Sequence, residues 1–156
     1  MVDFPPCDDV CGALEGHVRR FFGGRRVEAF TWEAGPVLAT NPHFRAATPD
    51  AEHGLEFIMT VYYHRRGQLG LGHTCPIGEP WLPGSQCDYI LVSLPYPFGP
   101  ELQECHVGDR HVDFLWLLPI TRAEREFKLA NGREALERLF DEAGLRYCEI
   151  ERTSVV

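Results

Sequence analysis

The spacing of apolar residues predicts a helix near the start of the chain and a strand soon after it. Over residues 10–22 apolar side chains recur every three to four positions, the period of a helix buried along one face. Asp8 or Asp9 can cap this helix, and the glycines from Gly23 end it. Residues 27–32 are rich in β-branched and aromatic residues and predict a short strand.

Three apolar runs in the middle of the chain predict the central strands of a sheet. They cover residues 55–64, 89–94 and 111–118. The first run is apolar on both alternations, as expected of a strand that is covered on both faces. Residues 40–54 predict a surface loop, and residues 67–87, dense in glycine and proline, predict an irregular segment.

The change from apolar to charged residues after the third run predicts a strand, a turn and a helix start. Pro119 cannot donate to a sheet and is expected to end the strand. Thr121 and Glu124 have the spacing of a capping box, in which each side chain accepts a hydrogen bond from the other residue's backbone N–H. The helix should end near Gly132.

A second helix is predicted to follow, with Gly144 as its stop, and residues 147–151 predict a last short strand. This order lacks a regular βαβ alternation, so we expect the α+β class: a central mixed, largely antiparallel sheet with helices packed against it. The 156 residues suit one domain spanning 1–156. Folding at this size buries roughly 70% of the surface that the unfolded chain exposes.

The charge balance bears on the partners of the protein. The net charge is -8 and the pI is about 5.3, which disfavours nucleic acids and anionic lipid and favours basic proteins. The first residues have no basic and apolar leader pattern, and no run approaches the roughly 18 apolar residues of a membrane span. We therefore expect a cytoplasmic protein that does not bind membranes.

The six cysteines and seven histidines show no strong metal motif. A structural zinc site usually pairs its ligands as C-x-x-C or H-x-x-x-H, and neither pairing occurs. Cys75 and Cys105 each lie close to a histidine, and Cys7 and Cys11 are four residues apart on the predicted first helix, but no second pair of that kind completes their ligand set. Buried free thiols are the expected state of the cysteines, and neither a metal nor a cofactor is predicted.

Catalytic motifs are also missing from the sequence. There is no G-x-S-x-G elbow or cysteine-protease signature, and Ser93 lies within a predicted strand. The glycines at 67, 70 and 72 lack the lysine of a P-loop. The protein is therefore predicted not to be an enzyme. The alternative is an unrecognised enzyme, or a small-ligand or metal binder, that uses His73, Cys75 or Asp88 within residues 67–88.

Large, stiff side chains gather in two irregular segments. Trp81 and Pro83 occupy one, and Tyr96 and Phe98 follow the second central strand. Exposed aromatics of this kind suit protein recognition. The commoner role of such side chains is a secondary core that covers the ends of the sheet.

Several of these segments together resemble the suppressor of fused family, in its bacterial single-domain form. The family's C-terminal half shows a PGS-x-x-D loop, a strand ending in slPYP, a WllPIT-x-x-E element and a Gly-x-x-aLe helix. In this chain the matching residues are Pro83–Asp88, Ser93–Pro97, Trp116–Glu124 and Gly132–Glu137.

The resemblance implies an α+β domain that binds another protein. The animal namesake is a cytoplasmic protein that clasps a peptide of a zinc-finger transcription factor between two domains. This chain has the length of one domain, so that partner is not expected here. Bacterial members have been proposed as immunity proteins that neutralise a toxin by binding it, and an acidic chain suits a basic toxin.

The sequence thus predicts a non-enzymatic protein-binding domain. Six residues are the expected contact surface: Trp81, Pro83, Gly84, Asp88, Tyr96 and Phe98. Pro119, Thr121 and Glu124 are expected to be structural. The partner's identity and the oligomeric state are not predicted.

Overall fold

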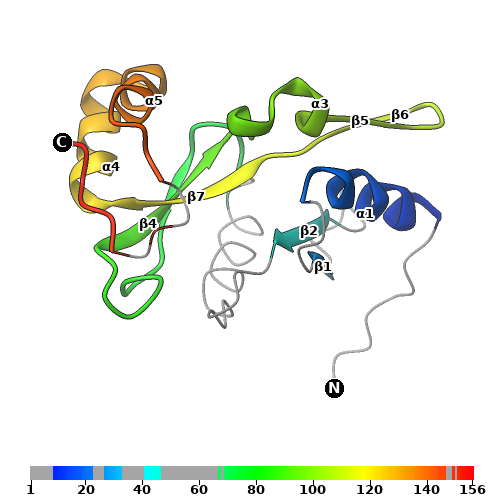
Figure 1. The fold of residues 1–156 in the computed structure, drawn as a ribbon, viewed down its shortest axis with the longest axis horizontal. Helices are drawn as coiled ribbons and strands as arrows, with labels where there is room; N and C mark the ends of the chain where they lie inside the picture. Colours follow the sequence, from blue (N-terminus) through cyan, green and yellow to red (C-terminus); the bar gives the residue numbers. More distant parts are fainter. Residues whose placement is uncertain are drawn as a thin grey trace. The chain divides into compact units, whose positions relative to one another are not determined.

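The computed structural model describes residues 9–22, 27–32, 41–46, 67, 69–146, 149 and 151–156 (Figure 1). The helices and strands are α1 (Asp9–Phe21), β1 (Val27–Trp32), β2 (Asn41–Ala46), β3 (Thr74–Pro76), β4 (Cys87–Ser93), η1 (Tyr96–Phe98), α3 (Pro100–Gln103), β5 (Glu104–Val107), β6 (Arg110–Asp113), β7 (Trp116–Thr121), α4 (Arg122–Asn131) and α5 (Arg133–Glu142). Every described strand pair is antiparallel. The predicted α+β class is confirmed.

The chain forms two compact units, each built from two stretches of sequence. One unit comprises residues 1–51 and 94–115, and the other comprises residues 52–93 and 116–156. The prediction of a single domain over 1–156 stays a prediction.

The unit of residues 52–93 and 116–156 contains a three-stranded sheet in the order β3-β4-β7. Leu91 of β4 lies opposite Leu118 of β7, so both side chains point to the same face. They pack with Ile120 and with Leu136 and Phe140 of α5, and none of these five side chains is exposed. This face of the sheet is the larger core of the unit.

The other face of the same sheet is also covered. Ile90 of β4 lies opposite Cys75 of β3, and both are buried together with Ile77. Trp81 and Leu117 pack against this second cluster. Because β4 is covered on both sides, its residues 89–93 are apolar or small, which explains the apolar run that predicted the strand.

The junction between β7 and α4 is the predicted capping box. The backbone N–H of Glu124 donates to Oγ1 of Thr121 over 3.2 Å, and the N–H of Thr121 donates to a carboxylate oxygen of Glu124 over 2.8 Å. At the far end of α4, Gly132 has φ 92°, a left-handed conformation that favours glycine and separates α4 from α5. Both signals were correctly located in the sequence.

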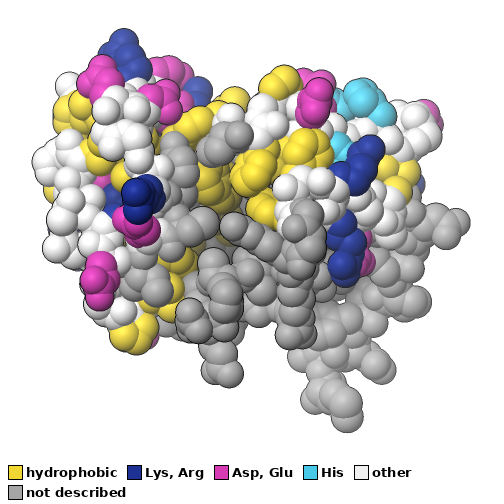
Figure 2. All heavy atoms as spheres, viewed as in Figure 1, with side chains coloured by type: hydrophobic (Ala, Val, Ile, Leu, Met, Phe, Trp, Pro, Cys, Tyr) yellow, Lys and Arg dark blue, Asp and Glu magenta, His cyan; other side chains and the backbone are white. Residues whose placement is uncertain are grey.

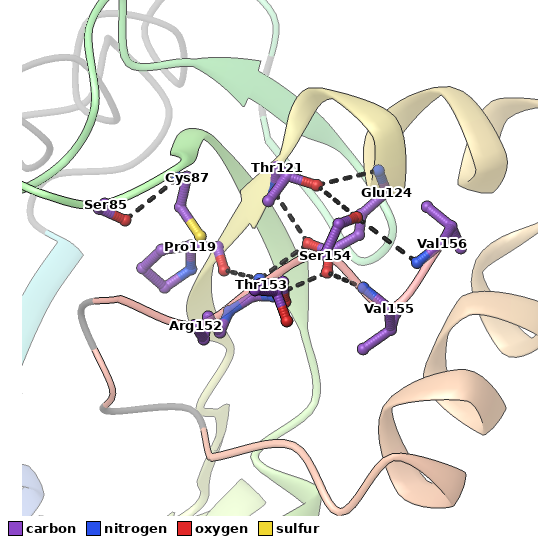
Figure 3. Close-up of polar contacts among 10 residues, drawn as sticks. All are labelled: Ser85, Cys87, Pro119, Thr121, Glu124, Arg152, Thr153, Ser154, Val155 and Val156. Carbon is purple, nitrogen blue, oxygen red and sulfur yellow. Dashed lines mark hydrogen bonds and ion pairs between the residues drawn. The ribbon is translucent and has the colours of Figure 1, made fainter.

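A buried ion pair fastens the C-terminal segment to this junction (Figure 3). Arg152 donates to both carboxylate oxygens of Glu124, over 2.7 and 2.8 Å, and to the carbonyl of Pro119 over 2.8 Å. The backbone N–H of Val155 adds a fourth hydrogen bond to the Glu124 carboxylate, and the hydroxyl of Ser154 contacts that of Thr121. One carboxylate therefore joins the end of β7, the start of α4 and the C-terminal segment.

The unit of residues 1–51 and 94–115 has its own small core and two ribbons. Val18 of α1 and Leu102 of α3 are buried there, with three phenylalanines packed against them. His17 donates to the carbonyl of Leu102 over 3.0 Å, and its ring stacks on Phe114. The ribbons are the pairs β1-β2 and β5-β6.

Three details of the sequence-based prediction are wrong. Residues 41–46 are not loop but form β2, paired with β1. The predicted strand 111–118 is two strands, because the chain leaves β6 after Asp113 and enters β7 at Trp116. Pro119 does not end β7 but lies inside it. Among the described strands β7 has a neighbour on one side only, and a proline, which has no N–H to donate, is tolerated on such a strand.

Two predicted strands lie in parts of the chain that the structure leaves undescribed. Residues 55–64 are all outside the described residues. Residues 147, 148 and 150 are outside them as well, and of the predicted strand 147–151 only Glu149 and Glu151 are described, both in irregular structure.

The buried ion pair gives a direct test of the fold. The Glu124 side chain is 0% exposed and that of Arg152 is 5% exposed, so Glu124→Ala leaves a guanidinium without compensation inside the protein. We expect the free energy of unfolding to fall by about 3–5 kcal/mol in urea denaturation. Glu126→Ala on the exposed face of α4 is the control, with an expected change within about 0.5 kcal/mol. Equal losses in the two variants would contradict this account.

Candidate functional site

The candidate site is the loop of residues 77–88, which connects β3 to β4 and is braced by its own backbone. The N–H of Ile77 donates to the carbonyl of Asp88, and the N–H of Trp81 donates to that of Cys87, each over 2.9 Å. The hydroxyl of Ser85 accepts from the N–H of Cys87 over 3.1 Å. These bonds continue the β3-β4 pairing into the loop, so its tip has a defined shape.

Four of the predicted contact residues belong to this loop, and the three at or near its tip have different settings. Trp81 is half-buried against the Cys75 and Ile90 side of the sheet, where it anchors the loop. Pro83 and Gly84 are exposed at the tip. Gly84 has φ 87°, a left-handed backbone that an L side chain rarely adopts. The tryptophan therefore packs on the secondary core while part of its surface stays accessible, and Pro83 and Gly84 are the more exposed of the three.

Asp88 lies where the loop enters β4 and forms an ion pair with the first residue of α4. Its carboxylate accepts from Arg122 over 3.2 Å, and the Arg122 side chain is 70% exposed. The hydrogen bond to Asp88 raises the pKa of Arg122 above its usual value. The Asp88 side chain is 24% exposed, so the accessible part of the pair is mainly Arg122, and an ion pair with one side in solvent contributes little to stability, about 0–1 kcal/mol.

The C-terminal segment places another carboxylate beside the loop tip. A Cβ on Gly84 would lie 3.9 Å from the side chain of Glu151, which is itself exposed. Glu79 is exposed within the loop. Glu79 and Asp88 are the acidic residues of the segment 77–88, which contains no lysine or arginine, and Glu151 lies beside its tip, so the charge that the segment itself carries is negative. Glu151 is the residue before Arg152, so the buried ion pair of Arg152 with Glu124 also holds the carboxylate of Glu151 near the loop tip.

The remaining two predicted contact residues lie in the other unit. Tyr96 is half-buried in η1, and the ring of Phe98 packs tilted against Phe22 with 5.0 Å between centroids. Phe98 keeps 37% of its surface exposed. The six residues therefore divide between two units, four and two, and their joining into one contact surface stays a prediction.

The described nucleophile candidates have structural settings. The hydroxyl of Ser93 is buried and donates to Glu137 over 2.6 Å, and Glu137 is in turn paired with Arg133 of α5. Burial raises the pKa of the Cys75 thiol to about 11, and it also raises the pKa values of Cys87 and Cys105. These thiols are protonated at neutral pH and are poor nucleophiles.

The residues of the alternative hypothesis also have separate partners. His73 accepts a hydrogen bond from the N–H of Gly70 over 3.0 Å, Cys75 is buried in the secondary core, and Asp88 binds Arg122. Each of the three side chains thus contributes to local structure.

Sequence reasoning missed one group that can hold a metal ion. Glu104, His106 and His111, all exposed on the β5-β6 hairpin, bring one ligand atom each within 4.8 Å of one another. The available signal was the H-x-x-x-x-H spacing of the two histidines around a Gly-Asp turn, which also falls within the range of zinc ligands.

The described helices include none with the length and apolar character to cross a membrane. The fold and the site together define an α+β protein in which a PGS loop joins two strands of a sheet and a capped strand-to-helix junction follows the third. The family model for Suppressor of fused protein (SUFU) matches residues 47–153, and the chain belongs to this family. The resemblance seen in the sequence motifs is confirmed.

A solved structure supports the same assignment over nearly the whole chain. The crystal structure of a SUFU (suppressor of fused protein) homolog from Neisseria gonorrhoeae is similar to this chain with a TM-score of 0.68 and 29% identity. The similarity covers 93% of this chain and 96% of that one. No curated protein matches the chain.

The raised pKa of Cys75 predicts how slowly this thiol reacts. At pH 7.5 a pKa of about 11, against an ordinary value of 9.0, lowers the thiolate fraction about 100-fold. Alkylation by iodoacetamide, followed by peptide mass spectrometry, should therefore be at least that much slower in the native than in the denatured protein. Equal rates would contradict the assignment. The unfolded thiol ionises first as pH rises, so the stability from this group is lost between pH 9 and 11.

Proposed function

We propose that this chain is a non-enzymatic protein-binding domain of the cytoplasm, an immunity protein that neutralises a basic toxin by binding it. The observation that carries the proposal is the exposed, acidic and backbone-braced loop of residues 77–88, in a chain of the suppressor of fused family. The proposed contact residues are Trp81, Pro83, Gly84 and Asp88 of this loop, with Tyr96 and Phe98 of the other unit.

The braced backbone supports recognition because association costs less when a contact surface is already ordered. Flexible loops lose conformational freedom on binding, whereas this loop is held by bonds at Ile77, Trp81 and Cys87 in the free chain. Pro83 adds a side chain with no rotamer freedom to lose. The loop thus presents its tip at low entropic cost.

The charges support a basic partner. The whole chain has a net charge of -8, and the loop face adds the local carboxylates of Glu79, Asp88 and Glu151. Complementary charge accelerates encounter and disfavours acidic partners, nucleic acids and anionic membranes. Because solvent-exposed charges are screened by salt, the rate of association should fall as ionic strength rises.

The settings of the described nucleophiles support a binding role over catalysis. Ser93 is engaged by Glu137 in the core of the sheet, and the Cys75 thiol is kept protonated by burial. The alternative assigns His73 and Asp88 to an enzyme or a ligand site. In the structure His73 accepts a hydrogen bond from the backbone of Gly70, and Asp88 accepts one from Arg122.

The first test is capture of the partner from the cells that produce the protein. A tagged chain should co-purify with one stoichiometric basic protein at low salt, identified by mass spectrometry, and should lose it at high salt. The purified partner should be toxic when expressed alone and harmless when this chain is co-expressed. Absence of a stoichiometric partner would overturn the proposal.

The contact surface is tested with charge-reversed variants of that complex. Glu79→Lys combined with Glu151→Lys should weaken binding at least about tenfold, or ~1.4 kcal/mol, in isothermal titration calorimetry. The matched control combines Glu126→Lys with Glu142→Lys, two exposed helix positions with the same change of net charge. If both pairs weakened binding equally, the loop would not be the contact surface.

A further inference from the structure

The β5-β6 hairpin gathers four polar side chains on one of its faces. In its antiparallel register Glu104 lies opposite Asp113, and His106 lies opposite His111. Directly opposed residues, and residues two apart along a strand, share a face of a ribbon. Cys105, which lies between Glu104 and His106 in the strand, points to the other face and is buried. The hairpin therefore has one covered face and one face lined by two imidazoles and two carboxylates.

Three ligand atoms on that face lie close together. One ligand atom each of Glu104, His106 and His111 lies within 4.8 Å of the others. The two imidazole rings stack with 4.7 Å between centroids, and Nε2 of His111 lies 3.7 Å from a carboxylate oxygen of Asp113. Figure 2 shows histidine side chains exposed over this hairpin with an acidic side chain beside them.

The chemistry of the set selects a class of metal ion. Imidazole nitrogen and carboxylate oxygen are the ligands of Zn²⁺ and related divalent transition metals, whereas Ca²⁺ and Mg²⁺ take oxygen ligands. Tetrahedral zinc with bonds of about 2.0 Å needs ligand atoms roughly 3.3 Å apart. Exposed side chains on a fixed pair of strands reach that spacing by rotation about their own χ angles, without moving the backbone.

We propose that the β5-β6 hairpin is a binding site for Zn²⁺ or a similar divalent transition metal. Glu104, His106 and His111 are the ligands, and Asp113 orients the imidazole of His111. The ion bridges the two strands and stabilises the hairpin. The site uses none of the residues of the loop 77–88, so it stands or falls separately from the proposed toxin-binding function.

The site is tested by zinc titration of the tag-free, metal-depleted full chain in calorimetry. Wild-type protein should bind Zn²⁺ through this site, and binding of Mg²⁺ at the same concentration should be undetectable. His106→Ala and His111→Ala should each weaken the zinc binding more than about tenfold, since loss of even an outer partner of a metal site costs that much. His73→Ala, an exposed histidine of the other unit, is the matched control and should bind as the wild type does.

Two checks keep the outcome decisive. Circular dichroism confirms that the variants fold, and His106→Gln and His111→Gln repeat the test with a polar side chain of similar reach. Zn²⁺ should raise the melting temperature of the wild type and of His73→Ala but not that of the hairpin variants. Absence of zinc binding by the wild type, or binding unchanged in the hairpin variants, would overturn the site.

Discussion

The structure of the unit of residues 52–93 and 116–156 depends on one buried carboxylate. Glu124 accepts hydrogen bonds from the backbone of Thr121, from both terminal nitrogens of Arg152 and from the backbone of Val155. Isolated buried charges are very costly, so this arrangement persists because the carboxylate and the guanidinium are each saturated with partners. Its consequence is geometric: a strand end, a helix start and the last residues of the chain are held at one point.

That point also determines the surface proposed to bind a partner. Arg122 follows the helix-capping residue Thr121 and donates to Asp88 at the base of the loop. Glu151 precedes Arg152 and lies beside Gly84 at the loop tip. The core below the loop is supplied by β4, whose two faces are both covered. A rigid loop with fixed negative charge suits the recognition of a folded basic protein, which is the form of binding expected of an immunity protein.

The sequence predicts what is encoded locally and misses what depends on distant pairing. Thr121 and Glu124 are three residues apart, and this spacing predicts the capping box. Arg152 lies 28 residues beyond Glu124, so no local pattern predicts that the two form an ion pair. The composition of residues 41–46 predicts a loop, but pairing with β1 overrides that preference and forms β2. The pair of His106 and His111 has a local signal, the H-x-x-x-x-H spacing around a Gly-Asp turn, but only the strand register of the folded hairpin sets the two residues opposite each other.

The loop of residues 77–88 is the surface proposed to contact the partner. Hydrogen exchange of the chain alone and in complex with its captured partner measures this directly, residue by residue. The account predicts that amide protection increases in the loop, above all at the exposed Gly78, Glu79, Gly84 and Gln86, and in the adjoining segment at Glu151. Protection that appears on α4 and α5 while the loop exchanges as in the free chain would contradict it.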